Sequence, residues 1–193
     1  MIQRNPKGVV FLDRDDTIVK SYGNRPANSV DEIELLPGVP EGLRKLKEVG
    51  LRTVVATNQG GIGFGYMTVE VLKAMNERLN DLLILAGAPT IDAFYWCPHL
   101  PREGCECRKP RPGMFIKAKE DLGIDLGASY MIGDNVRDME AAVCAGIRWP
   151  LVVVSDHYQD TPSARMIFPT FRDAATMVAM LESDRASIKG RHI

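Results

Sequence analysis

The alternation of short apolar runs with amphipathic segments is the feature that most constrains how this chain folds. Five apolar runs have the length expected of buried strands, at residues 9–12, 51–56, 91–96, 130–132 and 151–154. Four intervening segments repeat apolar residues with a helical period, at residues 39–49, 69–86, 114–122 and 136–145. Continuously apolar strands that alternate with helices are typical of a parallel sheet covered on both faces. We therefore predict an α/β fold whose ligand site lies at the carboxyl ends of the strands.

The length of the chain fits one globular domain. Its 193 residues are 45% hydrophobic, which is enough to build a sizeable core. We expect one domain over residues 1–183, followed by a flexible polar tail at residues 184–193. Two loop-like stretches, residues 20–37 and 97–112, follow the first and third strands. Neither is long enough for a separate cap domain, so we expect an open site roofed by loops.

The charge balance narrows the choice of partners. The 24 basic and 25 acidic residues nearly cancel, so no broad positive field attracts nucleic acid or anionic lipid. The apolar runs are too short to span a bilayer, and the first residues lack the pattern of an export signal. We expect a cytoplasmic monomer that acts on a small molecule.

Three carboxylates, those of Asp13, Asp15 and Asp16, directly follow the first predicted strand. Carboxylates crowded at a strand end repel one another unless a cation lies between them. Mg²⁺ prefers carboxylate and phosphate oxygens and would neutralise this repulsion. The alternative interpretation of this motif alone is a solvated acidic turn.

The second strand ends in Thr57, Asn58 and Gln59, and Gly60 begins a glycine-rich run. Hydroxyl and amide groups in this position would donate hydrogen bonds to phosphate oxygens. The glycines would let backbone N–H groups approach the same phosphate. An ordinary glycine-rich surface loop is the alternative.

Two further groups complete the polar set. Asp134 and Asp138 follow the fourth strand at the start of a helix. Lys109 precedes a helix that starts near a proline, and it would supply the positive charge that phosphoryl transfer needs. Taken singly, Asp134 is also explained as a helix cap, and Lys109 as a solvated lysine.

In this order, the four groups resemble the four motifs of the haloacid dehalogenase superfamily of phosphohydrolases, over residues 9–145. The resemblance implies a Rossmann-like parallel sheet with no cap domain. It also implies a Mg²⁺-dependent phosphatase with an aspartyl-phosphate intermediate. By this resemblance Asp13 is the nucleophile, and Asp15 is first the general acid and then the general base. Thr57 and Lys109 would stabilise the transferred group.

The same resemblance places Mg²⁺ between the Asp13 carboxylate, the Asp15 backbone carbonyl and Asp134, with Asp138 nearby. The sequence departs from the family at Asp16, where glycine is usual. Aspartate tolerates left-handed backbone better than most residues, so the turn is expected to survive. We expect the Asp16 side chain to point away from the site.

A cluster of three cysteines and a histidine predicts a second metal. Cys97, His99, Cys105 and Cys107 would supply the four ligands of a closed, structural Zn²⁺ site. A disulfide among them is the alternative, which a reducing cytosol and the strain of a Cys105–Cys107 link both oppose. The fourth cysteine, Cys144, lies in an apolar pattern and is expected in the core.

The zinc loop resembles that of one branch of the superfamily, the small phosphatases of heptose bisphosphates and of histidinol phosphate. The segment PRPGMF favours the heptose bisphosphate enzymes, which remove the 7-phosphate. By this resemblance Arg108 recognises the distal part of the substrate, a sugar bisphosphate, and residues 57–60 surround the transferred phosphate. Asn135 would touch the substrate and residues 21–24 would line the entrance. Asn135 and Phe64 stand where the branch often has cations, so other phosphorylated metabolites, histidinol phosphate included, and an inactive zinc-stabilised binding protein remain alternatives.

Overall fold

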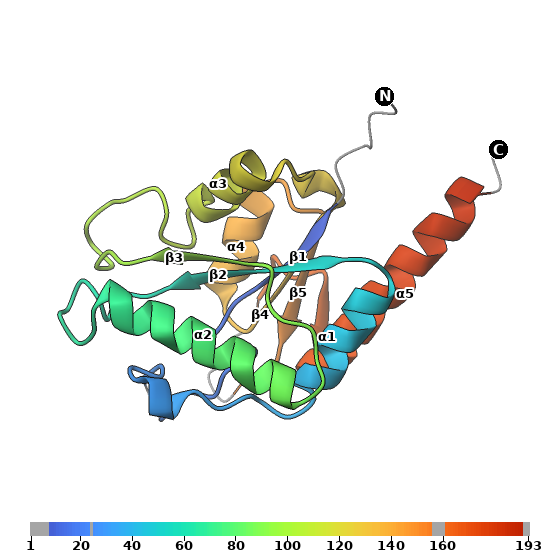
Figure 1. Cartoon of the computed structure of the whole chain (residues 1–193). Coiled ribbons are helices and arrows are strands. Elements are labelled where there is room, and N and C mark those ends of the chain that lie inside the picture. Colours follow the sequence, from blue (N-terminus) through green and yellow to red (C-terminus); the bar gives the residue numbers. More distant parts are fainter. Residues whose placement is uncertain (1–7, 24, 156–160, 191–193) are drawn as a thin grey trace.

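A six-stranded parallel sheet forms the centre of the protein (Figure 1). The computed structural model describes residues 8–23, 25–155 and 161–190, with side chains up to residue 187. The strands are β1 (Val9–Leu12), β2 (Arg52–Asn58), β3 (Ala93–Cys97), β4 (Tyr130–Gly133), β5 (Trp149–Val153) and β6 (Met166–Phe168). Their order across the sheet is β3-β2-β1-β4-β5-β6, and every neighbouring pair is parallel. The predicted α/β class and the Rossmann-like sheet are therefore confirmed.

Helices cover both faces of this sheet. They are α1 (Val39–Glu48), α2 (Val69–Leu85), α3 (Gly113–Leu122), α4 (Val136–Cys144) and α5 (Phe171–Gly190), with short 3₁₀ turns η1 (Val30–Glu32) and η2 (Leu126–Ala128). Helices α1, α2 and α5 pack on one face, and α3 and α4 pack on the other (Figure 1).

The residues of β1 show how the sequence supports this layering. Val10 and Leu12 pack into the core beneath α1, α2 and α5, whereas Val9 and Phe11 pack against α3 and α4. All four side chains are fully buried. Successive side chains of a strand point to opposite faces, so a strand that lies between two layers must be apolar throughout.

Local signals fix the ends of the helices. The Thr68 hydroxyl accepts a hydrogen bond from the Val71 N–H at 3.3 Å, which confirms the predicted cap of α2. Helix α3 ends at Gly123, whose φ of 61° lies in the left-handed region that glycine adopts without strain. Asn135 and Asp138 form a reciprocal capping box at the start of α4.

The structure differs from the sequence prediction after residue 154. Strand β6 and helix α5 were not predicted, because β6 is short and the apolar pattern of α5 is weakly periodic. The proposed domain boundary at residue 183 falls inside α5, which runs on to Gly190 and packs against α1; residues 191–193 lie outside the described part. Cys144 is exposed at the end of α4, so its predicted place in the core is wrong. It lies one residue beyond Val143, which also faces solvent.

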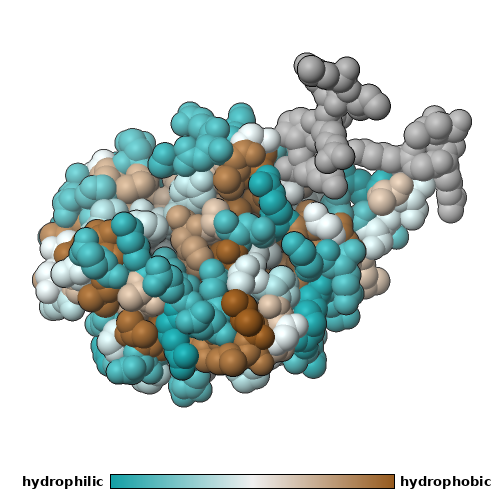
Figure 2. All heavy atoms as spheres, in the orientation of Figure 1, coloured by the Kyte–Doolittle hydropathy of each residue, from teal (hydrophilic) through white to brown (hydrophobic). Residues whose placement is uncertain are grey.

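No separate cap domain occurs among the described residues. The chain between β1 and α1 forms loops and the single turn η1, and the chain between β3 and α3 forms the cysteine-rich loop. None of the helices in the described ranges is long and apolar enough to cross a membrane. On the face drawn in Figure 2, hydrophobic residues lie interspersed among hydrophilic ones.

Candidate active site

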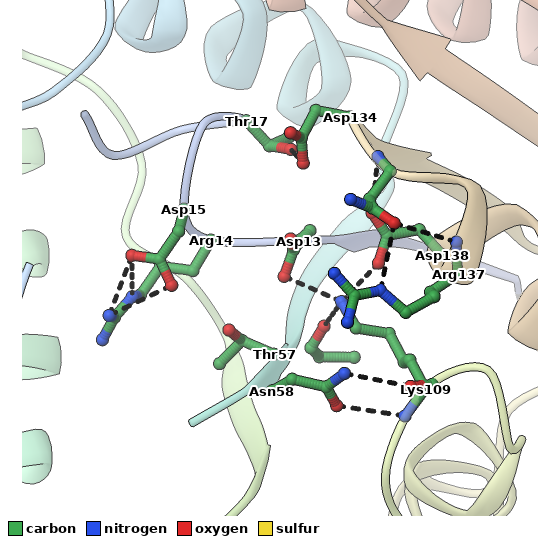
Figure 3. A network of polar contacts seen from close by, with 12 residues as sticks. Asp13, Arg14, Asp15, Thr17, Thr57, Asn58, Lys109, Asp134, Arg137 and Asp138 are labelled. Carbon is green, nitrogen blue, oxygen red and sulfur yellow. Dashed lines mark hydrogen bonds and ion pairs between the residues drawn. The ribbon is translucent and has the colours of Figure 1, made fainter. Parts of the chain in front are cut away.

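Residues from the carboxyl ends of β1, β2 and β4 meet at one edge of the sheet, as parallel topology predicts (Figure 3). They line an open cavity of about 340 Å³. The lining residues that the sequence singled out are Asp13, Asp15, Asp16, Ser21, Gly23, Thr57, Asn58, Arg108, Lys109, Asp134, Asn135 and Asp138. Segments more than 100 residues apart in the chain therefore contribute to a single cavity.

Lys109 is the buried positive centre of this cavity. Its Nζ lies 2.8 Å from Asp13 Oδ1 and 2.5 Å from Asp138 Oδ1. The same ammonium donates to the Ala56 carbonyl oxygen at 2.8 Å, so the β2 end also holds it. Although burial alone lowers the pKa of Lys109, the two carboxylates raise it overall, so this side chain stays charged.

The acidic side of the site carries an excess of negative charge. Burial, with the charges of Asp13 and Asp138, raises the pKa of Asp134 to about 8. Burial raises the pKa of Asp138 to about 6, against the opposing effect of Lys109. One lysine therefore does not compensate three adjacent carboxylates, and a cation among them would do so.

The carboxylates are close enough to share such a cation. One oxygen from each of Asp13, Asp134 and Asp138 lies within 4.8 Å of the others. Asp134 is oriented by the Thr17 hydroxyl at 3.4 Å and the Ser155 hydroxyl at 3.0 Å. An all-oxygen group of this kind fits Mg²⁺.

Asp138 is the member of this group that is most engaged by protein. Besides Lys109, it accepts a hydrogen bond from the Asn135 N–H at 3.0 Å. A Cβ added at Gly133 would lie 2.5 Å from Asp138 Oδ2, so only glycine leaves room for this carboxylate. Asp138 is therefore held by several protein groups, and its predicted place beside the metal stays a prediction.

The Asp15 carboxylate turns away from Asp13 and toward Arg14 (Figure 3). It accepts hydrogen bonds from Arg14 Nη2 at 2.9 Å and from Gln59 Nε2 at 2.9 Å. Burial and the neighbouring Asp13 charge raise the pKa of Asp15, although Arg14 opposes the shift. A raised pKa suits a carboxyl group that must donate a proton near neutral pH.

Two side-chain amides at the end of β2, those of Asn58 and Gln59, have roles that the sequence did not reveal. Gln59 is buried, lies outside the cavity lining, and donates to both Asp15 and the Thr57 hydroxyl, each at 2.9 Å. The side chain of Asn58 donates to the Lys109 carbonyl oxygen at 3.1 Å and accepts from the Lys109 N–H at 3.0 Å. Both side-chain amides therefore orient catalytic candidates, and the contact of residues 57–60 with a transferred phosphate stays a prediction.

The turn after β1 tolerates Asp16 in the way that was expected. Asp16 has a φ of 57°, in the left-handed region. Its Oδ1 accepts a hydrogen bond from the Ser21 N–H at 3.2 Å, which directs the carboxylate into its own loop. The residue still lines the cavity, and its charge contributes to the raised pKa of Asp134. Ser21 and Gly23 line the entrance, while Asn24 lies outside the described residues.

Cys97, His99, Cys105 and Cys107 form a compact cluster at the end of β3. Their ligand atoms lie within 4.8 Å of one another, and neighbouring pairs are 3.2–3.6 Å apart. None of the three thiols is in a disulfide. Burial and hydrogen bonds to Cys97 and Cys105 raise the pKa of Cys107 to about 12. A thiolate at Cys107 would therefore need a nearby cation, and the Cys₃His donor set fits Zn²⁺.

The cysteine loop continues directly into Arg108, on the cavity wall. Arg108 Nη1 donates to the His99 carbonyl oxygen at 3.0 Å, so the cluster and the arginine are linked through the backbone. A Cβ on Gly60 would lie 3.3 Å from this Nη1 atom, which makes Gly60 a neighbour of the arginine and not part of the cavity lining.

Two arginines of the cavity were missed by sequence analysis. Arg137 lies at the start of α4, two residues after Asn135, and Arg25 lies in the loop after β1. Arg137 lies between Asp134 and Asp138 in the sequence, and the spacing of these two aspartates already placed that helix start at the site. That spacing is the signal that would have identified it.

A carboxylate–lysine pair beside a group of oxygens that fits a cation, at the carboxyl edge of a parallel sheet, is typical of a class of α/β phosphohydrolases. The pattern of the haloacid dehalogenase-like hydrolase family matches residues 7–146, and this chain belongs to that family.

Relatives of this chain act on phosphorylated sugars. The D-glycero-beta-D-manno-heptose-1,7-bisphosphate 7-phosphatase of Yersinia pestis is 40% identical over 151 residues, covering 75% of this chain and 79% of the relative. The enzyme of the same name from Escherichia coli K12 is 39% identical, with 75% and 78% coverage. A D,D-heptose 1,7-bisphosphate phosphatase from B. bronchiseptica, complexed with magnesium and phosphate, superimposes with a TM-score of 0.82 and 28% identity. The superposition covers 90% of this chain and 98% of the B. bronchiseptica chain.

Proposed function

We propose that this protein is a Mg²⁺-dependent phosphatase that removes the 7-phosphate of D-glycero-D-manno-heptose 1,7-bisphosphate. The observation that carries the proposal is the contact between Asp13 and Lys109 at 2.8 Å, inside a cavity that also holds Asp134. This contact supports the proposal because a carboxylate able to attack phosphorus, a cation able to stabilise the transferred phosphoryl group and a carboxylate able to bind a metal lie together. The heptose bisphosphate phosphatases to which the chain is similar support the choice of substrate.

In the proposed reaction, an Asp13 carboxylate oxygen attacks phosphorus and forms an aspartyl-phosphate as the bond to the sugar oxygen breaks. Lys109 stabilises negative charge on the phosphoryl oxygens, and the Thr57 hydroxyl donates to the same group. Asp15 gives its proton to the departing sugar oxygen. It then takes a proton from the water that hydrolyses the aspartyl-phosphate.

The Arg14–Asp15–Gln59 contacts have a role in this scheme. They hold the Asp15 carboxylate at the cavity wall while leaving Asp13 accessible. Gln59 also contacts Thr57, so the proton donor and the hydroxyl are oriented by one amide. We propose that Gln59 and Asn58 also act as positioning residues, in addition to the phosphate-binding role expected for them.

Asp13 and Asp134 would hold Mg²⁺, with the Asp15 backbone carbonyl as a third protein ligand and Asp138 beside them. When bound, the ion supplies charge neutralisation for the nucleophile and the phosphate oxygens. The cluster of oxygens within 4.8 Å and the raised pKa of Asp134 support this placement.

We also propose that Cys97, His99, Cys105 and Cys107 hold a structural Zn²⁺. Sulfur atoms at two corners of a zinc tetrahedron are about 3.8 Å apart, given Zn–S bonds of about 2.3 Å. The observed sulfur pairs, at 3.6 Å, approach this separation without forming a disulfide. Four protein ligands leave no open position, so the ion would stabilise the loop from which Arg108 and Lys109 extend.

The enzyme is proposed to act as a cytoplasmic monomer. One chain supplies every residue assigned to the reaction, so catalysis needs no second copy. The unpaired thiols of the zinc loop suit a reducing compartment. Light scattering of purified protein at catalytic concentrations tests the monomer.

Phosphorus NMR tests the substrate and the position of hydrolysis. With Mg²⁺ present, the 7-phosphate signal of either anomer of the bisphosphate should disappear while the 1-phosphate signal remains. The wild-type kcat/KM for the preferred anomer should exceed that for histidinol phosphate by roughly a hundredfold, because a site built for two anions discriminates against one. Preference for histidinol phosphate would overturn the substrate, and absence of turnover on any phosphate ester would indicate the inactive binding protein.

A further inference from the structure

A second cavity along the zinc loop adjoins the active-site cavity. Each has a volume of about 340 Å³, and they share Arg108, Lys109 and Arg137 as lining residues. The second cavity is bounded by Pro101 and Gly104 on the zinc loop. Arg108 and Arg137 therefore lie between the two cavities and contribute to both.

Four cationic side chains line the active-site cavity, namely Arg25, Arg108, Lys109 and Arg137. Lys109 is neutralised by its two carboxylates, and Arg25 pairs with Glu32 at 2.5 Å. Over the described part of the chain, neither Arg108 nor Arg137 lies within 4.0 Å of a carboxylate oxygen. These two arginines, here called the arginine pair, are thus the cavity cations whose charge is available to a ligand.

Arg137 is oriented by its own helix cap. Its Nε donates to Asn135 Oδ1 at 3.1 Å, and its backbone N–H donates to the same oxygen at 3.2 Å. This contact occupies one edge of the guanidinium and leaves the terminal nitrogens as donors. Figure 3 shows the guanidinium extending from the start of α4 toward Asp13 and Lys109.

Arg108 is fixed on the zinc loop through one hydrogen bond to His99, described above. Like Arg137, it keeps several N–H donors for a ligand. A planar guanidinium binds phosphate through two parallel hydrogen bonds, and two guanidiniums match the double negative charge of a phosphate monoester.

We propose that the arginine pair binds the phosphate that remains on the sugar, with Asn135 as the positioning residue for Arg137. This inference rests on the proposed function and deepens it. It assigns to Arg137 a specificity role that distinguishes a bisphosphate from a monophosphate. It also explains how the site gains a second cation although position 135 carries an uncharged amide.

The test uses two substrates that differ only in the 1-phosphate, heptose 1,7-bisphosphate and heptose 7-phosphate. In the Mg²⁺-loaded full-length protein, Arg137→Ala should lower kcat/KM for the bisphosphate by roughly tenfold to a hundredfold, mainly through KM. The loss for the 7-phosphate should stay within about twofold. Arg137→Lys should recover part of the loss, because it keeps the charge without the fork of donors. Arg78→Ala, an exposed arginine on α2, is the matched control and should change neither value.

Asn135→Ala separates positioning from binding. If Asn135 acts through Arg137, the double variant Asn135→Ala/Arg137→Ala should lose no more bisphosphate preference than Arg137→Ala alone. Thermal unfolding measures the separate cost of the lost helix cap. Additive losses of preference would overturn the positioning role.

The outcomes distinguish the inference from the proposed function. A wild-type preference for the bisphosphate that survives Arg137→Ala would overturn the inference alone. Equal losses on both substrates would also overturn it, because Arg137 would then serve the transferred phosphate or the fold. A wild type that does not distinguish the two substrates would overturn both the arginine-pair subsite and the proposed substrate.

Discussion

The two candidate metal clusters are built on opposite principles. The carboxylate cluster of Asp13, Asp134 and Asp138 draws on strand ends that are far apart in sequence, and it faces an open cavity. The sulfur cluster is contained in one loop of eleven residues and includes all four ligands of a closed tetrahedron.

The difference lies in what each cluster leaves free. Oxygen ligands that face a cavity suit an exchangeable ion that also contacts substrate. Three sulfurs and a ring nitrogen leave no position for substrate, so that ion would shape the loop and not the reaction. Chemistry and architecture are thus assigned to separate sites, which are joined through Arg108 and Lys109.

The strongest test of this division of roles between the two clusters is a substitution of the proposed nucleophile, Asp13. Asp13→Asn should lower kcat by at least about a thousandfold, because an amide oxygen does not form the phosphoryl intermediate. The protein should remain folded, as judged by circular dichroism, and should keep its zinc. Activity within about tenfold of wild type would contradict the assignment of the carboxylate cluster as the chemical centre.

Metal removal separates the two clusters directly. Brief treatment with a chelator should abolish activity, and added Mg²⁺ should restore it, because the open site exchanges its ion. Elemental analysis of the same chelator-treated protein should still find about one zinc per chain. Purified protein without zinc would refute the closed tetrahedral site.

Arg108 tests the link between the clusters. Arg108→Ala should lower kcat/KM for the bisphosphate by roughly tenfold to a hundredfold, through lost charge-assisted hydrogen bonds. Hydrolysis of a simple aryl phosphate should change by less than about twofold, since that substrate has no second anion. Similar losses on both substrates would mean that the zinc loop contributes to the transferred phosphate as well.

The smallest effect on catalysis is expected within the sulfur cluster. Cys107→Ser should lower Tm by about 5–10 °C and reduce activity on the bisphosphate several-fold, because a loosened loop no longer holds Arg108 firmly. Cys144→Ser, at an exposed cysteine outside the cluster, should shift Tm by no more than about 2 °C. Unchanged stability of the Cys107 variant would show that the loop does not depend on its ligands.

Much of this site was predictable because the chemistry follows the strand ends. The apolar runs located β1, β2 and β4, and the polar residues after them gave Asp13, Thr57 and Asp134. The cysteine cluster was predictable from spacing alone, since four ligand side chains within one short loop must lie close together.

The remaining details depend on side-chain direction, which spacing does not determine. Gln59 and Asn58 have side-chain amides of the kind that bind phosphate, yet both amides form hydrogen bonds with neighbouring protein groups. Arg137 was missed because a charged residue on a helix is most often solvated. Cys144 was misplaced because a sequence of small apolar residues does not reveal which of them faces solvent.

The two hydrogen bonds between Asn58 and the main chain of Lys109 bear on protein engineering. The Asn58 side chain donates one hydrogen bond to the Lys109 main chain and accepts one from it, as paired residues of neighbouring strands do. These bonds fix the Lys109 main chain at the end of β2, and so help to hold its ammonium beside Asp13. A chimera that exchanges residues 98–107 for a loop of another length should still deliver the lysine correctly if Asn58 is retained. Aspartate at position 58 would lack the N–H donor, and the shorter serine side chain would not reach the Lys109 main chain. The loop that can be exchanged therefore ends before Lys109, whose main chain Asn58 binds.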